Sequence, residues 1–481
     1  MVFLYIALGA LAVMLLLLLA AVIIAAAGGK KIPVINNYAT PVELQDEYAS
    51  KLAQMLKYET VALSSGGSEG QFEQYFAVLQ QLFPLFFQKA KRIEIENAYF
   101  FLIEGTKKDG NPNLVMSHSD VVKAEGQWKY PPFGGVVAEG KIFGRGSQDI
   151  KGMLLTIFQS LENLLQKGWA PIDDLYILSG KDEETGGKGA KNCAQWFRQN
   201  NITLETVLDE GGTVANGLFP GVENDLALLG MAEKGYIDIK FTAKRKGGHS
   251  SAPQKDNSVA ALAKFICYCS KRKVFKAHYL PVIKETFKTI APYCAFPLRI
   301  VMCNMWLFSG LLKVVLPKLS PQVGALVSSN MVFTMIEGSK SSNVLPPSAS
   351  AVANIRYLND ENAADIIARL TKLAKKFGIE TESKALLIKK ASSVTPTSAP
   401  QYAFIKSLIE KHMPSTIVAP YLMIGATDSC AFDGVAKQTV RFCPIRVSSK
   451  QLVTVHAPDE NIGVTELAKG VELMQDYLLA I

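Results

Sequence analysis

Short apolar segments that alternate with amphipathic helices are the feature that most restricts the fold of this chain. Residues 113–118, 174–180 and 206–209 are brief apolar runs with the length of buried strands. Apolar residues recur at helical spacing over residues 152–168, and residues 188–200 predict a second helix. Strands that alternate with helices predict an α/β layer with a mixed, largely parallel sheet flanked by helices.

Polar clusters follow or accompany these predicted strands. In an α/β fold, the loops beyond the carboxyl ends of the strands share one edge of the sheet, where binding sites form. Acidic side chains gathered there repel one another, and histidine with carboxylate is the ligand set of zinc and similar divalent ions. Two histidines with several carboxylates could fill two metal sites that share one bridging carboxylate. The five clusters are His118-Ser119-Asp120, residues 144–149, residues 182–187, Asp209-Glu210-Gly211-Gly212 and residues 456–460.

The order and spacing of these clusters resemble a known family. Nearly everything after residue 90 is similar to the co-catalytic zinc metallopeptidases that include glutamate carboxypeptidase, aminoacylase, succinyl-diaminopimelate desuccinylase and carboxypeptidase S. Within this family, residues 306–308 (WLF) and 441–444 (RFCP) resemble the branch of carboxypeptidase S and N-fatty-acyl-amino acid synthase/hydrolase. The motifs are specific for the fold and the metal site, and less so for the substrate. They read SHSDVV, GRGSQDIKG, DEETGG, LDEGG and GGHSSAP.

The resemblance implies two Zn²⁺ ions per subunit, for which Co²⁺ or Mn²⁺ could substitute. Asp149 would bridge the two ions. The acid in LDEGG would complete the first site, and we expect Glu210 there, with Asp209 as the alternative. The expected ligands are His118, Asp149 and Glu210 for one ion, and Asp149, Glu184 and His456 for the other.

The resemblance also implies catalytic and substrate-binding roles. Asp120 would accept the other N–H of the His118 imidazole and orient that ring. Glu183 would be the general base that takes a proton from the attacking water and returns it to the leaving amine. His249 would stabilise the oxyanion, and in dimeric relatives this histidine comes from the neighbouring subunit. Asn343 and Arg356 match positions that hold the substrate, and Arg356 could bind a carboxylate in a bidentate pair.

One position departs from the family pattern. Relatives commonly carry an arginine in the loop written here as residues 425–430, and the expected arginine is Cys430. If that arginine helps to hold a terminal carboxylate, the substitution weakens or replaces the contact. Strict carboxypeptidase specificity therefore does not follow from the resemblance. We expect Cys430 to be a small packing residue, because no histidine–cysteine pair is evident.

The pattern along the chain predicts a catalytic domain interrupted by an inserted lid. Residues 32–233 and 359–481 would form the catalytic α/β domain. Residues 234–358 would form an α+β lid of the dimerisation type, since they combine alternating strands with helical segments. The apolar stretch 298–319 carries charges and a proline, so we expect lid helices rather than a membrane span. We hypothesise that this stretch lines an acyl groove.

Residues 1–29 differ from the rest, because they carry no charged side chain and include 26 apolar residues. Such a segment is long enough to span a bilayer as a helix. A transmembrane anchor is expected, with a cleaved signal peptide and a buried core helix as alternatives. A membrane-anchored or secreted protein follows, with the catalytic domain outside the cytoplasm if the segment acts as an export signal. The remaining residues have the composition of an ordinary globular protein.

Together these features predict a di-zinc hydrolase that cleaves the amide bond of small peptides or N-acyl amino acids. The alternative is a non-catalytic, membrane-anchored metal- or ligand-binding protein on the same fold, which would have lost the base or some ligands. The net charge of +8 is spread along the chain without a basic run interleaved with aromatics, so no nucleic-acid partner is expected. A homodimer is compatible with the inserted lid.

Overall fold

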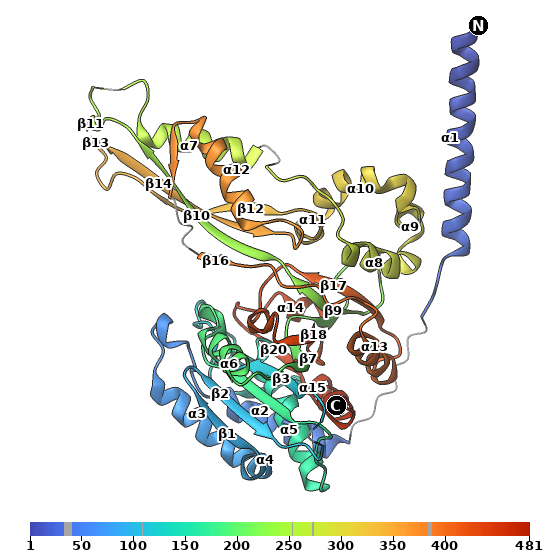
Figure 1. Ribbon diagram of the computed structural model, residues 1–481, viewed down its shortest axis with the longest axis vertical. Helices are drawn as coiled ribbons and strands as arrows, with labels where there is room; N and C mark the ends of the chain where they lie inside the picture. Colours follow the sequence, from blue (N-terminus) through green and yellow to red (C-terminus); the bar gives the residue numbers. More distant parts are fainter. Residues whose placement is uncertain (33–40, 108, 253, 272–273, 383–386) are drawn as a thin grey trace.

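The chain folds around two β-sheets, which Figure 1 shows one above the other. The structure is a computed structural model. It describes all residues except 33–40, 108, 253, 272–273 and 383–386. The larger sheet contains ten strands and the second sheet five, among the described residues. The predicted mixed, largely parallel sheet flanked by helices is confirmed.

The strand order of the larger sheet brings three predicted strand ends together. Strand β3 lies between β6 and β7 and runs parallel to both. Since parallel strands end at the same edge, the clusters that follow these strands become neighbours. The order is β1 (Lys91–Ile95), β2 (Ala98–Ile103), β6 (Leu175–Gly180), β3 (Asn113–His118), β7 (Leu204–Asp209), β18 (Ala436–Arg441), β9 (Leu226–Glu233), β8 (Thr213–Ala215) and β19 (Arg446–Val447), with β17 (Ile417–Met423) beside β9.

Helices cover both faces of this sheet. On one face, α5 (Lys151–Gln166) packs against α15 (Val464–Leu479) and α2 (Val42–Met55). On the other face, α6 (Lys188–Gln199) packs on β2, where Phe100 and Phe197 belong to a separate apolar cluster. The predicted helix 152–168 is confirmed, because its apolar positions are buried and Gly168 has the positive φ of +76° that favours glycine.

The second sheet is antiparallel and carries its own core. It contains β12 (Asn330–Glu337), β14 (Ser348–Tyr357), β10 (Gly235–Lys244), β15 (Ile379–Thr381) and β16 (Leu387–Lys389). Helices α7 (Ser258–Lys271) and α12 (Ala363–Lys375) pack on its buried face. Because β15 and β16 pair with β10, this sheet continues beyond the expected limit at residue 358. We propose that the inserted unit runs to residue 389.

A helical segment within the insert packs on the larger core instead. It comprises α8 (Pro281–Ile290), α9 (Phe296–Cys303), α10 (Met305–Leu319) and α11 (Pro321–Val327). Ile283 and Phe287 of α8 are buried in the main apolar cluster, and the Thr286 hydroxyl donates to the carbonyl of Pro420 in β17 at 2.7 Å. Helix α8 thus packs against β17 of the larger sheet rather than against the second sheet.

The remaining elements include the N-terminal helix and two further small sheets. The N-terminal α1 (Val2–Ala27) leaves most of its side chains exposed, so it is not a core helix. Its residues 5–27 form a helix long and apolar enough to cross a membrane, judged by length and composition alone. The other helices are α3 (Glu69–Leu82), α4 (Pro84–Lys89), α13 (Pro400–His412) and α14 (Ser449–Leu452), and the other strands are β4 (Val136–Ala138), β5 (Lys141–Phe143), β20 (Asn461–Gly463), β11 (Gly248–His249) and β13 (Val344–Leu345). The two small sheets are formed by β4, β5 and β20 and by β11 and β13.

Candidate functional site

His118 forms the centre of the first group of candidate ligands. It is the last residue of β3, and its imidazole is buried. The Nε2 atom lies 3.1 Å from Oδ1 of Asp149 and 3.2 Å from Oε1 of Glu210. The Nδ1 atom faces Asp120, at 2.9 Å from the backbone carbonyl and 3.4 Å from Oδ1. One ring nitrogen is thus directed to the acidic group and the other to a positioning residue.

Glu210 and Asp209 leave β7 in different directions. The Glu210 carboxylate faces His118, whereas Oδ2 of Asp209 accepts the backbone N–H of Ser429 at 2.9 Å. Successive side chains at a strand end point to opposite sides, so only one of the two can face the neighbouring strand's histidine. The geometry therefore favours Glu210 over Asp209 as the ligand.

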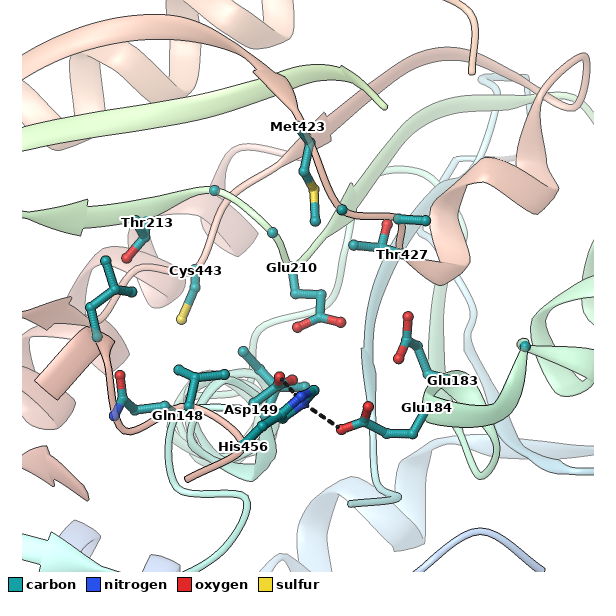
Figure 2. Close-up of a pocket in the computed structure, with 18 of the residues that line it drawn as sticks. Gln148, Asp149, Glu183, Glu184, Glu210, Thr213, Met423, Thr427, Cys443 and His456 are labelled. Carbon is teal, nitrogen blue, oxygen red and sulfur yellow. Dashed lines mark hydrogen bonds and ion pairs between the residues drawn. The ribbon is translucent and has the colours of Figure 1, made fainter. Parts of the chain in front are cut away.

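A second group shares Asp149 with the first. Oδ2 of Asp149 lies 3.0 Å from Nε2 of His456, which also contacts Oε1 of Glu184 at 3.2 Å. Figure 2 shows His456 between these two carboxylates, with Glu210 facing the same space. The ligand atoms in each group lie within 4.8 Å of one another. The two oxygens of Asp149 are directed to different histidines, as a bridging carboxylate requires.

The electrostatics of these groups favour positive charge between the side chains. Burial, and then the neighbouring Asp149 and Asp209, raise the pKa of Glu210 to about 8, although His118 acts in the opposite direction. Hydrogen bonds that the His456 ring donates to the carboxylates of Asp149 and Glu184 raise its pKa to about 10. Burial would lower the pKa of His118, but the surrounding carboxylates raise it well above its usual value. Carboxylates and imidazoles grouped in this way are a donor set that suits divalent cations.

Asp120 joins the first ligand to the loop that carries the expected base. This fully buried carboxylate accepts the backbone N–H of Glu183 and of Glu184, each at 3.1 Å. The Glu183 side chain lines the cavity, as Figure 2 shows, and its burial raises its pKa well above the usual value. Asp182 plays a different part, because it accepts the backbone N–H groups of Lys188 and Gly189 at the start of α6.

Glu460 is a supporting residue that the sequence did not single out. Its buried carboxylate accepts the backbone N–H groups of Gly146, Gln148 and Asp149 at 3.1, 2.7 and 3.1 Å. It also pairs with the buried guanidinium of Arg145. This one side chain therefore fixes the loop that presents Asp149. The sequence placed Glu460 in the last acidic cluster. Its contact with the loop of Asp149 could not be predicted, because about 310 residues separate the two segments.

The loop with Cys430 is tied to the sheet through other residues. The Thr427 hydroxyl donates to Glu233 at 2.7 Å, and Glu233 pairs with the buried Arg441. Cys430 is half-buried, and burial raises the pKa of its thiol to about 12. A thiol in that state is a poor nucleophile, which agrees with a packing role.

The two groups open into a cavity of about 680 Å³. Both sheets contribute to its wall, since Tyr236, Arg356 and Lys389 come from the second sheet. Arg356 is therefore placed where a substrate could meet it. No residue of the stretch 298–319 lines this cavity, among the described residues, so the hypothesis of an acyl groove in this stretch has no support from the cavity.

His249 and Asn343 lie elsewhere. They stand at the tip of the second sheet, where β11 pairs with β13, and both are exposed. Figure 1 shows this tip far from the larger sheet. Nδ1 of His249 lies 2.7 Å from the hydroxyl of Ser251. Within one chain, the structure does not bring these two residues to the cavity.

Comparison with known proteins gives consistent matches. Residues 114–480 match the description "Peptidase family M20/M25/M40". The chain is 29% identical over 439 residues to "Probable carboxypeptidase S-like 2" of Dictyostelium discoideum, covering 89% of this chain and 83% of that protein. It is also 29% identical over 412 residues to "N-fatty-acyl-amino acid synthase/hydrolase PM20D1" of Xenopus tropicalis, covering 84% and 78%.

A solved structure supports the fold. The M20 family metallo-carboxypeptidase Sso-CP2 from Sulfolobus solfataricus superimposes with a TM-score of 0.68 at 19% identity, covering 90% of this chain and 99% of that one. At this identity the likeness concerns the fold. The two-sheet arrangement described above is thus shared with a metal-dependent peptidase.

Proposed function

The chain belongs to peptidase family M20/M25/M40, and from this premise we propose that it cleaves the amide bond of small peptides or N-acyl amino acids with two zinc ions. The observation that carries the proposal is the position of Asp149, whose two oxygens face His118 and His456 while Glu183 lines the same cavity. A binding protein without activity would have no need to retain both groups and the adjacent carboxylate.

The residues of the site would have different roles in the proposed reaction. Zinc ions held by the two groups would supply an acidified water and polarise the carbonyl oxygen of the substrate. Glu183 would take the proton of the attacking water and deliver it to the leaving nitrogen. Burial raises the pKa of Glu183 well above its usual value, which makes this carboxylate a stronger proton acceptor than an exposed glutamate. Asp120 would hold Glu183 and Glu184 in place through their backbone N–H groups.

Two substrate classes fit this proposal, and the name of a relative points to each of them. One relative carries the name of a carboxypeptidase and another that of an N-fatty-acyl-amino acid synthase/hydrolase. Both classes end in an amino-acid carboxylate next to the scissile amide. Arg356 in the cavity wall is suited to this carboxylate, since guanidinium and carboxylate form bidentate hydrogen bonds.

His249 and Asn343 fit a role in a homodimer, in which a second copy supplies them. The edge strand β12 supports this assembly, because it leaves Val332, Met335 and Ile336 exposed. Co-expression of Glu183→Gln with His249→Ala would test it. Each variant alone should be inactive, whereas mixed dimers would unite both wild-type residues in one site and recover about a quarter of the activity. Inactive mixtures that still form mixed dimers would contradict the sharing of sites.

The N-terminal helix is proposed to be the membrane anchor, with a cleaved signal peptide as the alternative. Its length and apolar composition support either role. In both cases the catalytic part would lie outside the cytoplasm if the segment acts in export. The intact mass of protein purified from eukaryotic cells distinguishes them, because cleavage would remove roughly 3 kDa.

The hydrolase proposal as a whole is tested on the full chain in detergent. Dipeptides and N-acyl amino acids of increasing chain length are supplied with and without a chelator, and bound metal is quantified. We expect turnover that stops on chelation and returns with zinc. Purified protein that holds no metal and turns over neither substrate class would favour the non-catalytic binding protein.

A further inference from the structure

Helices α9 and α10 form a bent apolar elbow on the surface of the molecule. The chain bends by 114° at Asn304, between the two helices. Large apolar side chains remain exposed along this elbow, which is unusual for a helix that packs on a core. They are Phe296 (45% exposed), Trp306 (60%), Leu311 (53%) and Val314 (45%).

The corner of the elbow lies directly against α1. The side-chain amide of Asn304 donates to the backbone carbonyl of Ala21 at 2.9 Å. Ala21 and Ala25 are fully buried, since small residues at this spacing allow close approach of two helices. The backbone N–H of Lys30 then donates to Pro292 at 3.0 Å. The elbow is therefore beside the last two turns of α1, as Figure 1 also shows.

Basic side chains surround a cavity between these helices. The cavity has a volume of about 820 Å³ and no acidic residue among its lining residues. Lys284 and Lys288 of α8 and Lys313 of α10 contribute cations, while Ile24 and Trp306 contribute apolar wall. Apolar surface next to clustered lysines is the pattern of a segment that lies in the interface of an anionic bilayer.

We propose that the elbow is a bilayer-contacting surface and that the basic cavity holds the head group of an anionic phospholipid. This inference rests on the proposed anchoring role of α1, because an inserted α1 carries its last turns, and the elbow beside them, to the membrane surface. A tilt of α1, usual for spanning helices, lowers the elbow into the interface. In the described part of the chain, no carboxylate forms an ion pair with Lys284, Lys288 or Lys313. A second protein copy would not require these lysines together with an exposed tryptophan beside a spanning helix.

The surface is tested with the full chain in nanodiscs of phosphatidylcholine that contain brominated lipid, with or without phosphatidylserine. Bromine quenches nearby tryptophan, so wild-type fluorescence should be quenched and Trp306→Phe should lose that component. The triple variant Lys284→Ser/Lys288→Ser/Lys313→Ser should lose the stronger quenching seen with phosphatidylserine. Equal quenching in the wild type and Trp306→Phe would overturn the proposal.

Two further measurements separate this inference from the proposals on which it rests. Resistance to carbonate extraction reports the anchor, and an extracted protein would overturn both the anchor and the surface. Amidase activity in detergent reports the site, and Trp306→Phe should leave it unchanged, because Trp306 lies outside the catalytic cavity.

A second inference comes from a row of side chains across the second sheet. Tyr236 of β10 is directly opposite Arg356 of β14 on one side and Lys389 of β16 on the other. Opposed residues of paired strands point to the same face, and all three line the catalytic cavity. The Arg356 guanidinium stands 4.5 Å from the centre of the Tyr236 ring.

Both cations face the cavity without a carboxylate partner. In the described part of the chain, no acidic oxygen lies within 4.0 Å of Arg356 or Lys389.

We infer that Lys389 is a specificity-determining residue that binds the substrate carboxylate together with Arg356. This inference deepens the proposed function, since the carboxylate is that of the amino acid released by hydrolysis. Lys389 from β16 would place a second cation beside Arg356 in the cavity wall. Loss of one charged hydrogen bond should weaken carboxylate binding by roughly 10- to 100-fold.

Binding is measured by calorimetry in the Glu183→Gln background, so that the result does not depend on turnover. An N-acyl amino acid and its carboxamide are compared. Lys389→Met should weaken binding of the acid alone, Lys389→Arg should restore it, and the exposed neighbour Lys390→Met should have no effect. Equal losses for the acid and the carboxamide would overturn the role of Lys389, whereas wild-type protein that binds the acid without hydrolysing it would contradict only the hydrolase proposal.

Discussion

Oδ1 of Asp120 accepts the backbone N–H of Glu183 at 3.1 Å, while the same atom lies 3.4 Å from Nδ1 of His118. A single buried carboxylate thus connects the first ligand group to the loop of the proposed base. Because both contacts use the charged acceptor, its charge should matter as much as its shape. This connection suggests the first prediction.

Replacement of Asp120 by asparagine should weaken these contacts. The neutral amide oxygen is a weaker acceptor than a carboxylate, and the amide nitrogen would face the backbone N–H of either Glu183 or Glu184. We expect zinc affinity to fall roughly 10- to 100-fold and kcat to fall more than KM rises. Zinc affinity is measured by competition with a chelator. Asp182→Asn is the matched control, since Asp182 caps α6 and does not touch His118, and its zinc affinity should stay at the wild-type level.

Substitutions of the adjacent Glu183 and Glu184 should have different effects, the first on catalysis and the second on metal binding. Glu183→Gln removes the proposed base and should lower kcat by about 10²- to 10⁴-fold with bound zinc retained. Glu184→Gln weakens the group that contains His456, so it should lose zinc from one of the two sites. Metal analysis and steady-state kinetics on the same preparations check both outcomes. Equal metal loss in the two variants would argue against distinct roles.

The buried pair of Glu460 and Arg145 should be important for stability. Glu460→Gln leaves the guanidinium of Arg145, which is 1% exposed, without its counter-charge, and should lower the free energy of unfolding by about 3–5 kcal/mol. Urea unfolding measures the change. Glu380→Gln, which removes an exposed pair with Lys244, is the control and should cost about 0–1 kcal/mol.

Removal of metal should make stability depend on pH. In chelated protein, the pKa of Glu210 rises from 4.5 to about 8 and that of His456 from 6.5 to about 10. Both folded-state values are raised, so the folded chain holds these protons more tightly than the unfolded chain does. Stability of the chelated protein should therefore fall as pH rises from about 4.5 to about 10. Thermal unfolding across this range checks the sign.

The same shifts predict the pH dependence of zinc binding. At pH 7 the ion-free site holds protons that zinc must displace, so affinity should increase with pH and binding should release protons. Calorimetry in buffers with different ionisation enthalpies counts them. Zinc binding without proton release would show that the acidic groups are already ionised in the free protein.

Much of the site could be predicted from sequence because its residues stand in local patterns. An apolar run followed by a polar cluster predicts a strand end, as at His118, and the helical period of residues 152–168 predicts α5. Parallel pairing then brings such ends to one edge, whatever the connections between them. The predicted α/β sheet with an inserted second unit followed from these patterns.

Other relationships depended on partners far away in the sequence. The motif left Asp209 as an alternative to the expected ligand Glu210, and the structure shows that Asp209 accepts the backbone N–H of Ser429 from a distant loop. The sequence pattern placed the end of the insert at residue 358. It did not show that β15 and β16, which come later in the chain, pair with β10. The apolar face of α8 did not reveal its partner in the sequence, and the structure shows that this helix packs on β17.

The sequence by itself therefore determined the chemistry of the ligands, the type of fold and the apolar nature of the first helix. These properties are encoded in residue type and short-range period. Only the tertiary structure decided which acid faces His118, which cations line the cavity and that His249 stands at a distant tip. Those outcomes depend on strand pairing and helix packing between segments hundreds of residues apart, which a local pattern does not specify.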